Sequence, residues 1–209
     1  MQDINTVSSE CKNLTAGSVK VGQTVCFGSY EQGNGKEPIE WSVLEVKEGR
    51  ALLLSRFGLD SKPFNPEYKS VSWASCSLRR WLNNTFLKLA FTESEREKII
   101  EAMVPAEKNP THGTSSGRAT LNKVFLLSLS EASEYFATDA ERVCEPTVYA
   151  RKKGAYVSEE SVGAWWWLRT AGAGTPFATA VDNNGMTVVY GYEVERATLS
   201  VRPALWVKL

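Results

Sequence analysis

Apolar residues in the first third of the chain follow the pattern of antiparallel strands. The segment from Val19 to Tyr30 is rich in β-branched and aromatic residues, and a turn-rich stretch at 33–38 separates it from a second such run, IEWSVLEV at 39–46. A turn signal at 47–50 precedes a third run, ALLLS at 51–55. These runs predict a β-meander whose last two strands form an antiparallel hairpin.

The pattern then changes to the spacing of helices. Apolar residues recur at three- and four-residue intervals, which predicts a helix that turns them to one buried face: Leu78, Trp81, Leu82, Phe86 and Leu89. Thr92 and Glu95 form a capping-box pattern, which predicts a second helix that carries Ile99, Ile100 and Met103 and ends before Pro105.

Further capping boxes indicate short helices in the middle of the chain. Ser128-x-x-Glu131 and Thr138-x-x-Glu141 predict helices at 129–136 and 139–143, and TVYARKK at 147–153 predicts another turn or two that Gly154 closes. Before these helices, KVFLLS from Lys123 is a buried strand or a core segment. The polar stretch 109–117 is predicted to be a loop that is free to protrude.

The last fifty residues return to strand patterns. GAWWWLRT, PFATAVD, MTVVYGY and VRPALWVKL each read as a strand, with an Asn-Gly turn at 184–185 between the second and the third. In a strand, Trp165 and Trp167 share one face and Trp166 takes the other, so we interpret the triplet as the core of a doubly buried central strand. The order of elements predicts an α+β fold in which N- and C-terminal strands meet in one sheet and the loops carry function.

Composition narrows the classes of function. The 209 residues suit a single domain, which we place at 18–209 after a flexible lead-in at 1–17. Lys+Arg and Asp+Glu are equal at 24 each, so the charge gives no sign of nucleic acid binding. No apolar run reaches the length of a membrane span, so we expect no membrane insertion, and residues 1–17 lack the apolar stretch of a secretory signal.

The chemistry-bearing residues do not form a catalytic motif. The one histidine, His112, lies in the polar loop with no group to orient it, and the carboxylate pairs at 159–160 and at 193 and 195 read as hydrated surface. The stretch 33–38 lacks the features of a phosphate loop, and Asp182 to Gly185 read as a hairpin turn in preference to a calcium site. We therefore expect no enzyme activity, no cofactor and no metal.

The four cysteines are widely separated, and no Cys-x-x-Cys pattern supports structural zinc. Cys26 lies in an apolar strand and Cys76 beside a helix start. Buried free thiols are therefore favoured over a disulfide, which stays as the alternative.

Several phrases, taken in order, carry a family resemblance. The chain resembles the bacterial domain of unknown function 6273 family over about residues 18–209, through VGQTVCFGSYEQ, NGKEPIEWSVLEV, ALLLSRFGLD, CSLRRWLNNTFLKLAF, KVFLLSLSEASEYF, PTVYARKKGAY, WWWLRTAG and VRPALWVKL. The WLR and VRPALW phrases also resemble the C-terminal part of C-type-lectin-like domains. Among these are the variable proteins of diversity-generating retroelements and, more remotely, formylglycine-generating enzymes.

The resemblance to variable proteins implies a scaffold and a displayed stretch. The scaffold would be Trp165 to Arg169, Gly172, Val181, Gly185 and Val201 to Trp206, and the displayed residues would lie between Ala173 and Thr198. In such proteins the adenines of template codons are mutated, so an Asn codon yields a restricted set of residues. Met186, Glu193 and Glu195 fall outside that set. The residues inside it are the predicted ligand-binding positions Ala173, Gly174, Thr175, Phe177, Ala180, Asp182, Val189, Tyr190 and Tyr192.

The resemblance thus implies a non-catalytic domain that binds a protein or glycan ligand, with Phe177, Tyr190 and Tyr192 as aromatic anchors. One alternative is a fixed glycan- or protein-binding module of a surface or phage protein. Another is an enzyme related to the formylglycine-generating enzymes. Those enzymes need a reactive cysteine pair near the C terminus, whereas the last cysteine here is Cys144, so that activity is not carried over.

Overall fold

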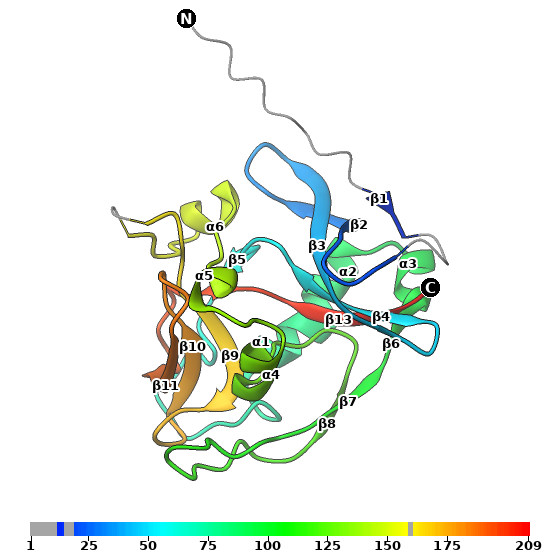
Figure 1. Cartoon of the computed structure of the whole chain (residues 1–209). Helices are drawn as coiled ribbons and strands as arrows, with labels where there is room; N and C mark the ends of the chain where they lie inside the picture. The colour runs from blue at the N-terminus through cyan, green and yellow to red at the C-terminus, as the bar shows by residue number, and fades with distance from the viewer. Residues whose placement is uncertain (1–11, 15–18, 159–160) are drawn as a thin grey trace, which may run out of the picture.

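The computed structural model describes residues 12–14, 19–158 and 161–209, which form an α+β fold with two larger, mainly antiparallel sheets (Figure 1). The strands are β1 (Lys12–Asn13), β2 (Thr24–Glu31), β3 (Lys36–Lys47), β4 (Arg50–Ser55), β5 (Asp60–Ser61), β6 (Ile99–Ile100), β7 (Ala102–Val104), β8 (Thr120–Asn122), β9 (Trp166–Ala171), β10 (Phe177–Val181), β11 (Thr187–Glu193), β12 (Ser200–Val201) and β13 (Ala204–Lys208). The helices are α1 (Ser77–Trp81), the π-helical segment η1 (Leu82–Phe86), α2 (Leu87–Ala90), α3 (Glu93–Lys98), α4 (Leu129–Glu134), α5 (Asp139–Arg142) and α6 (Val148–Lys152).

The first sheet has the order β1-β2-β3-β4-β13-β6. It confirms the predicted meander, and the β3–β4 hairpin closes through Glu48 and Gly49, both with positive φ as a tight hairpin turn requires. Strand β13 pairs antiparallel with β4, so N- and C-terminal strands do share a sheet. Most of the predicted lead-in lies outside the described residues; within it, Lys12–Asn13 form the short strand β1, which pairs in parallel with β2.

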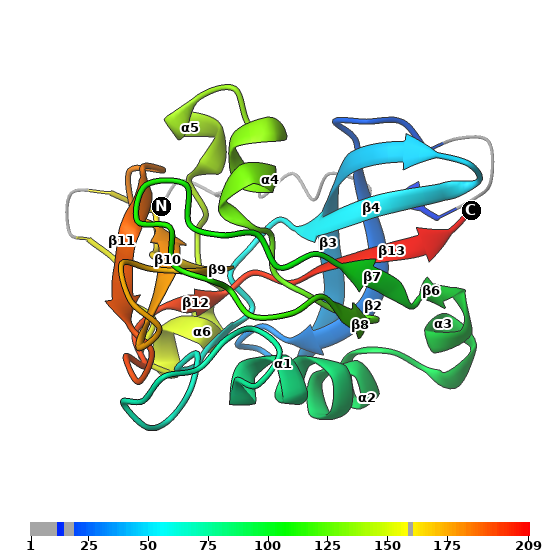
Figure 2. The same cartoon turned by 90° about the horizontal axis from the view of Figure 1, so that it is seen from below.

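The second sheet has the order β11-β10-β9-β12-β5, with β9 at its centre. Trp166 and Trp167 are fully buried, as predicted for a doubly covered strand. The predicted terminal strand is divided in two by Arg202 and Pro203, because proline cannot donate to a sheet ladder. The chain crosses at this point from the second sheet to the first (Figure 2).

The predicted helix at 78–89 forms, but its buried face differs from the prediction. Leu78, Leu82, Phe86 and Ala90 are buried at four-residue intervals, whereas Leu89 is 48% exposed. The π-helical segment explains the change, because its extra residue per turn keeps a four-residue row on one face.

The second predicted helix begins as expected and ends early. The Thr92–Glu95 capping box is present, but α3 ends at Lys98. Ile99 and Ile100 instead pair with the edge of β13, and Met103 lies in β7. The helical assignment of these three residues is therefore wrong, because sheet pairing of the β-branched isoleucines outweighs local helix propensity.

The remaining short helices α4, α5 and α6 are confirmed, with the predicted caps Ser128 and Thr138 on the first two and Thr147 as the cap of the third. Residues 124–127 are buried without forming a strand, joined to β13 by a single bridge between Phe125 and Ala204, so this stretch is a core segment. Figure 2 shows the helices on opposite sides of the strands, with α1–α2 below and α4–α5 above. Within the described ranges, no helix combines the length and apolar character needed to cross a membrane.

The cysteines divide into two kinds. Cys26 is disulfide-bonded, so the prediction of a free thiol there is wrong; strand β1 beside it shows that the N-terminal segment comes alongside β2. Cys76 and Cys144 are buried free thiols, as predicted. Burial raises the pKa of the Cys76 thiol to about 12, so this thiol is unreactive. Cys11 lies outside the described residues.

Candidate recognition surface

Four aromatic side chains from four separate segments meet at one end of the second sheet. Tyr68 follows β5, His112 lies between β7 and β8, and Phe177 and Tyr190 belong to β10 and β11. Their ring centroids form a chain, with 6.2 Å from Tyr68 to Phe177, 5.5 Å from Phe177 to Tyr190 and 5.8 Å from Tyr190 to His112. Tyr68 and Tyr190 are 56% and 57% exposed. We call these four residues the ring surface.

Hydrogen bonds fix the segment that carries Tyr68 to the second sheet. The backbone N–H of Val71 donates to the carbonyl of Thr175 at 3.2 Å, and the Thr175 and Ser70 hydroxyls lie 2.8 Å apart. Thr175 therefore connects the segment after β5 to the turn between β9 and β10.

Asn109 fixes the segment that carries His112. Its buried side-chain amide donates to the carbonyls of Ala171 and Val189 at 2.9 and 2.8 Å, and its Oδ1 accepts from the His112 backbone N–H at 3.0 Å. Thr114 adds a bond to the carbonyl of Ala173. The loop 109–117 is thus docked on the sheet, and the prediction that it is free to protrude is wrong, because a buried asparagine satisfies two strand carbonyls.

Glycines allow the backbones under the ring surface to approach closely. A Cβ at Gly172 would lie 2.3 Å from the carbonyl oxygen of Tyr190, and one at Gly191 would lie 2.5 Å from that of Ala178. Gly191 also has a φ of +83°, and β10 has a register shift between Ala178 and Ala180. Tyr190 is therefore presented from an irregular stretch of sheet that only glycine permits.

A second aromatic group surrounds Trp165. Tyr192 stacks on Trp165 with centroids 4.9 Å apart and an angle of 12°, Tyr156 lies on the same indole at 4.6 Å, and the Arg196 guanidinium lies 5.1 Å from the Tyr192 ring. Burial, with the Asp182 carboxylate adding to it, raises the pKa of Tyr192. Trp165 is only partly buried, so its assignment to the core is wrong; the other two tryptophans of the triplet are the core.

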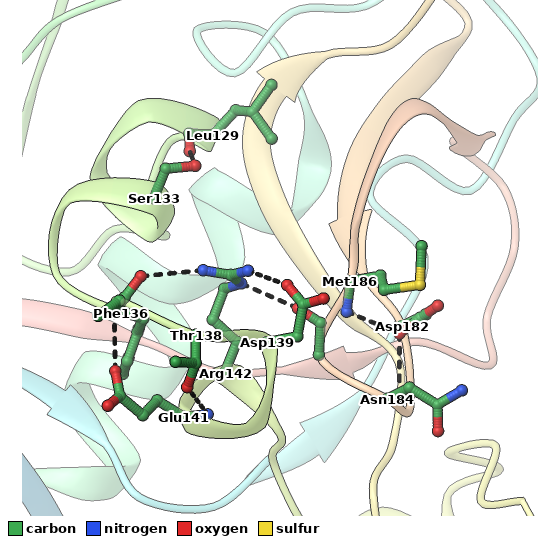
Figure 3. Close-up of polar contacts among 12 residues, drawn as sticks. Leu129, Ser133, Phe136, Thr138, Asp139, Glu141, Arg142, Asp182, Asn184 and Met186 are labelled. Atoms are coloured by element: carbon green, nitrogen blue, oxygen red, sulfur yellow. Dashed lines mark hydrogen bonds and ion pairs between the residues drawn. The ribbon is translucent and has the colours of Figure 1, made fainter.

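The tip of the β10–β11 hairpin is held by α5. Figure 3 shows the buried Arg142 guanidinium between the two, where it donates to the carbonyls of Phe136 and Gly185 at 3.0 and 2.9 Å and pairs with Asp139. A Cβ at Gly185 would lie 1.7 Å from the Asp139 carbonyl oxygen, so no other residue fits there.

Within the same tip, Asp182 Oδ1 accepts from the backbone N–H groups of Asn184 and Met186, both at 2.9 Å (Figure 3). This carboxylate oxygen shapes the turn, which supports the hairpin interpretation.

The predicted binding residues fall into different places. Ala173, Gly174, Thr175, Phe177 and Tyr190 lie together, since the Ala173 N–H donates to the Tyr190 carbonyl and the Phe177 N–H to the Gly174 carbonyl.

The other four predicted residues lie elsewhere. Ala180 is 0% exposed and does not belong to any exposed surface. Asp182 is part of the hairpin turn, Val189 is half-buried with its carbonyl bonded to Asn109, and Tyr192 belongs to the Trp165 group.

Sequence reasoning missed Tyr68 as a binding residue and treated His112 only as a possible catalyst. No periodicity marks either residue, because both lie in irregular segments that only the fold brings together. Of the carboxylates, Glu193 pairs with Arg196 and Glu195 is exposed, while Glu159 and Glu160 lie outside the described residues. In the part of the chain that the structure describes, no three His, Cys, Asp or Glu residues gather as metal ligands.

Comparison with known proteins establishes the family. The sequence model described as domain of unknown function (DUF6273) matches residues 48–209, and the chain belongs to this family. No curated protein and no solved structure matches the chain.

Proposed function

We propose that this domain is a non-catalytic binding module and that a glycan or protein ligand binds at the ring surface. The observation that carries the proposal is the convergence of four partly exposed rings from four segments, each held by hydrogen bonds to the same sheet. Tyrosine supplies a large contact area with few rotatable bonds, so its ordering costs little entropy on binding. The rings are already in contact with one another, which reduces that cost further.

The buried part of the second sheet supports this proposal as a rigid frame. Arg169, two residues after the tryptophan triplet, is 2% exposed, donates to the carbonyl of Leu126 at 2.8 Å and pairs with Glu131 in a bidentate ion pair. Side chains on a frame of this kind can change without moving the backbone beneath them.

We further propose that the fold is C-type-lectin-like and that its exposed stretch is diversified by a retroelement. Shared pairing of N- and C-terminal strands and long loops between them are consistent with such a fold. Five residues of the set that adenine mutation permits form one continuous region beside or within the ring surface. Ala180 and Asp182 are excluded from this region because they are buried and turn-forming, respectively.

A binding screen tests the proposed module. The purified chain is applied to an array of glycans and an array of purified bacterial surface proteins, and each spot that binds is repeated with Tyr190→Ala and with Tyr156→Ala. Tyr156 is the matched control, a 43% exposed tyrosine outside the ring surface. We expect Tyr190→Ala to weaken binding about tenfold or more, as for an interface hot spot, and Tyr156→Ala to bind as the wild type does. Equal binding by all three proteins would contradict the proposal.

DNA sequence tests diversification separately. A nearby repeat of the region coding for 165–206 that differs from it only at adenines, together with a reverse transcriptase gene, is expected. A genome with neither the repeat nor the reverse transcriptase gene would contradict diversification and leave the alternative of a binding module with a fixed sequence.

A further inference from the structure

A second surface, distant in sequence from β9–β11, combines exposed apolar side chains with unpaired positive charge. Strands β7 and β8 form a separate two-stranded ribbon (Figure 2). In this ribbon Met103 is the direct cross-strand partner of Leu121. These side chains are 63% and 50% exposed. An adjacent pair of exposed large apolar side chains is a feature of interaction sites.

Leu121 lies between two hollows. One has a volume of about 400 Å³ and is lined by residues of α2, α3 and the strand ends, among them Leu87, Lys88, Arg96, Glu101 and Lys123. The other has a volume of about 300 Å³ and is lined by residues that include Arg79, Met103 and Arg118. An apolar ridge with a hollow on each side suits a ligand that carries an apolar side chain between two polar ones.

The charge of the two hollows is strongly biased. Five cationic side chains line them, against the single carboxylate of Glu101: Arg79, Lys88, Arg96, Arg118 and Lys123. Among the described residues, none of the five takes part in a salt bridge, although the whole chain has equal numbers of acidic and basic residues.

Three of these cations are held in place by carbonyl groups. Arg79 donates to the Leu121 carbonyl at 3.0 Å, Arg96 to that of Phe91 at 2.9 Å, and Lys123 to that of Arg96 at 3.1 Å. A neutral acceptor leaves the positive charge uncompensated, so each of them attracts an anionic group.

We propose that the β7–β8 surface binds an acidic peptide segment, whose carboxylates pair with the cations in the two hollows while an apolar side chain covers Met103 and Leu121. Charge complementarity favours this occupant. A membrane fits less well, because the cations line hollows and the exposed pair Met103 and Leu121 alone would give little insertion energy. The ring surface does not take part, so this inference stands apart from the proposed function.

The test measures fluorescence anisotropy of a labelled peptide of alternating Glu and Leu, with a peptide of alternating Gln and Leu as the comparison. We expect the Glu peptide to bind and its affinity to fall as the salt concentration rises, because salt screens the attraction between exposed charges. The Gln peptide should bind at least tenfold more weakly. Equal binding of the two peptides would overturn the proposal. So would attachment of the protein to phosphatidylglycerol vesicles without binding of the Glu peptide.

Paired variants locate the site. Lys88→Glu with Arg118→Glu reverses two exposed charges of the hollows, and Lys20→Glu with Lys208→Glu reverses two exposed charges elsewhere, so both proteins have the same net charge. We expect about a tenfold or greater loss of peptide binding for the first protein and a change of less than about twofold for the second. An equal loss in the two proteins would show attraction by net charge alone and overturn the assignment.

Removing the apolar pair completes the test. Met103→Ser with Leu121→Ser is expected to weaken binding several-fold while thermal unfolding confirms that the protein folds. Unchanged affinity in this folded variant would overturn the apolar part of the proposal.

Discussion

Strands β10 and β11 are neighbours in one hairpin and have opposite surroundings. In β10 the four residues from Ala178 to Val181 are at most 1% exposed, because β9 and β11 flank the strand and other segments cover both faces. In β11, at the sheet edge, Tyr190 is 57% exposed and only Gly191 is buried. The two strands of one hairpin thus differ in place, one as buried frame and one as exposed surface.

The comparison shows where sequence change is tolerated. Replacing a β10 side chain alters a packed interior, whereas replacing Tyr190 alters contacts with Phe177 and His112 at the surface. The side chains of an exposed strand can therefore vary while its supporting strand stays constant, as the proposed binding surface requires. The following experiments probe this division from its strongest expected effect to its weakest.

The largest effect is expected from the frame. Trp166 is fully buried, donates from its indole to the Arg142 carbonyl at 3.1 Å and lies under the Arg202 guanidinium at 4.8 Å. Trp166→Ala should lower the free energy of unfolding by about 3–5 kcal/mol, the usual cost of a large cavity. Chemical denaturation measures it, and a loss below about 1 kcal/mol would show that this strand is not the frame.

A smaller effect is expected at the hairpin tip. Gly185→Ala places a methyl group against the Asp139 carbonyl, whereas Gly113→Ala, at a similar positive φ of +68°, meets nothing within 4 Å. Gly113→Ala, the control, should lower the free energy of unfolding by about 1–2 kcal/mol through backbone strain alone. Gly185→Ala should lower it further, because the hairpin tip must separate from α5. Thermal unfolding of the two variants gives the difference, and equal losses would mean that the contact with α5 does not fix the hairpin.

Much of this fold follows from local sequence signals. The hairpins, the capping boxes and the buried tryptophans of β9 depend on contacts within a few residues, or on one dominant pattern, and these predictions hold. The errors at Ile99, Leu89 and Asn109 have another origin. Ile99 and Asn109 bond to strands far along the chain, and Leu89 follows a π-helical turn. No rule based on residue spacing reveals either cause.

The candidate site follows from the sequence only in part, because some of its residues are close in sequence and others meet through long-range contacts. Tyr190 and Phe177 lie in one hairpin, so a single segment contains both. Tyr68 and His112 join them only because Ser70 bonds to Thr175 and Asn109 bonds to the carbonyl of Val189, both across a long stretch of chain. Ala180 is among the predicted binding residues because an adenine-mutated Asn codon can yield alanine. That codon rule carries no information about burial, so it does not reveal that Ala180 lies in the core.

The two tyrosines of β11 sharpen the comparison within one strand. Tyr192 is half-buried and stacked on Trp165, so Tyr192→Ala should lower the free energy of unfolding by about 1 kcal/mol. Tyr190→Ala should change it by less than about 0.5 kcal/mol, as at an exposed site. Parallel urea titrations compare them, and the reverse order would place Tyr190 in the frame.

The smallest effect concerns alkaline pH. The pKa of Tyr192 is raised in the folded protein, so the neutral phenol is favoured there. Its contribution to stability is complete below the pKa of an unfolded tyrosine, near 10, and is lost as the pH rises from there through the higher folded pKa. The free energy of unfolding of the wild type should therefore fall relative to Tyr192→Phe between about pH 9 and 11. A constant difference across this range would contradict the raised pKa.

The division between frame and surface is tested most directly by a displayed library scored for both folding and binding. One library varies Tyr68, His112 and Tyr190, and the other varies Trp166, Ala178 and Ala180; protease resistance reports folding, and the array ligand of the wild type reports binding. We predict that most members of the first library fold but fail to bind, while most members of the second do not fold. A first library that unfolds as often as the second, or that folds and keeps its ligand, would contradict the account.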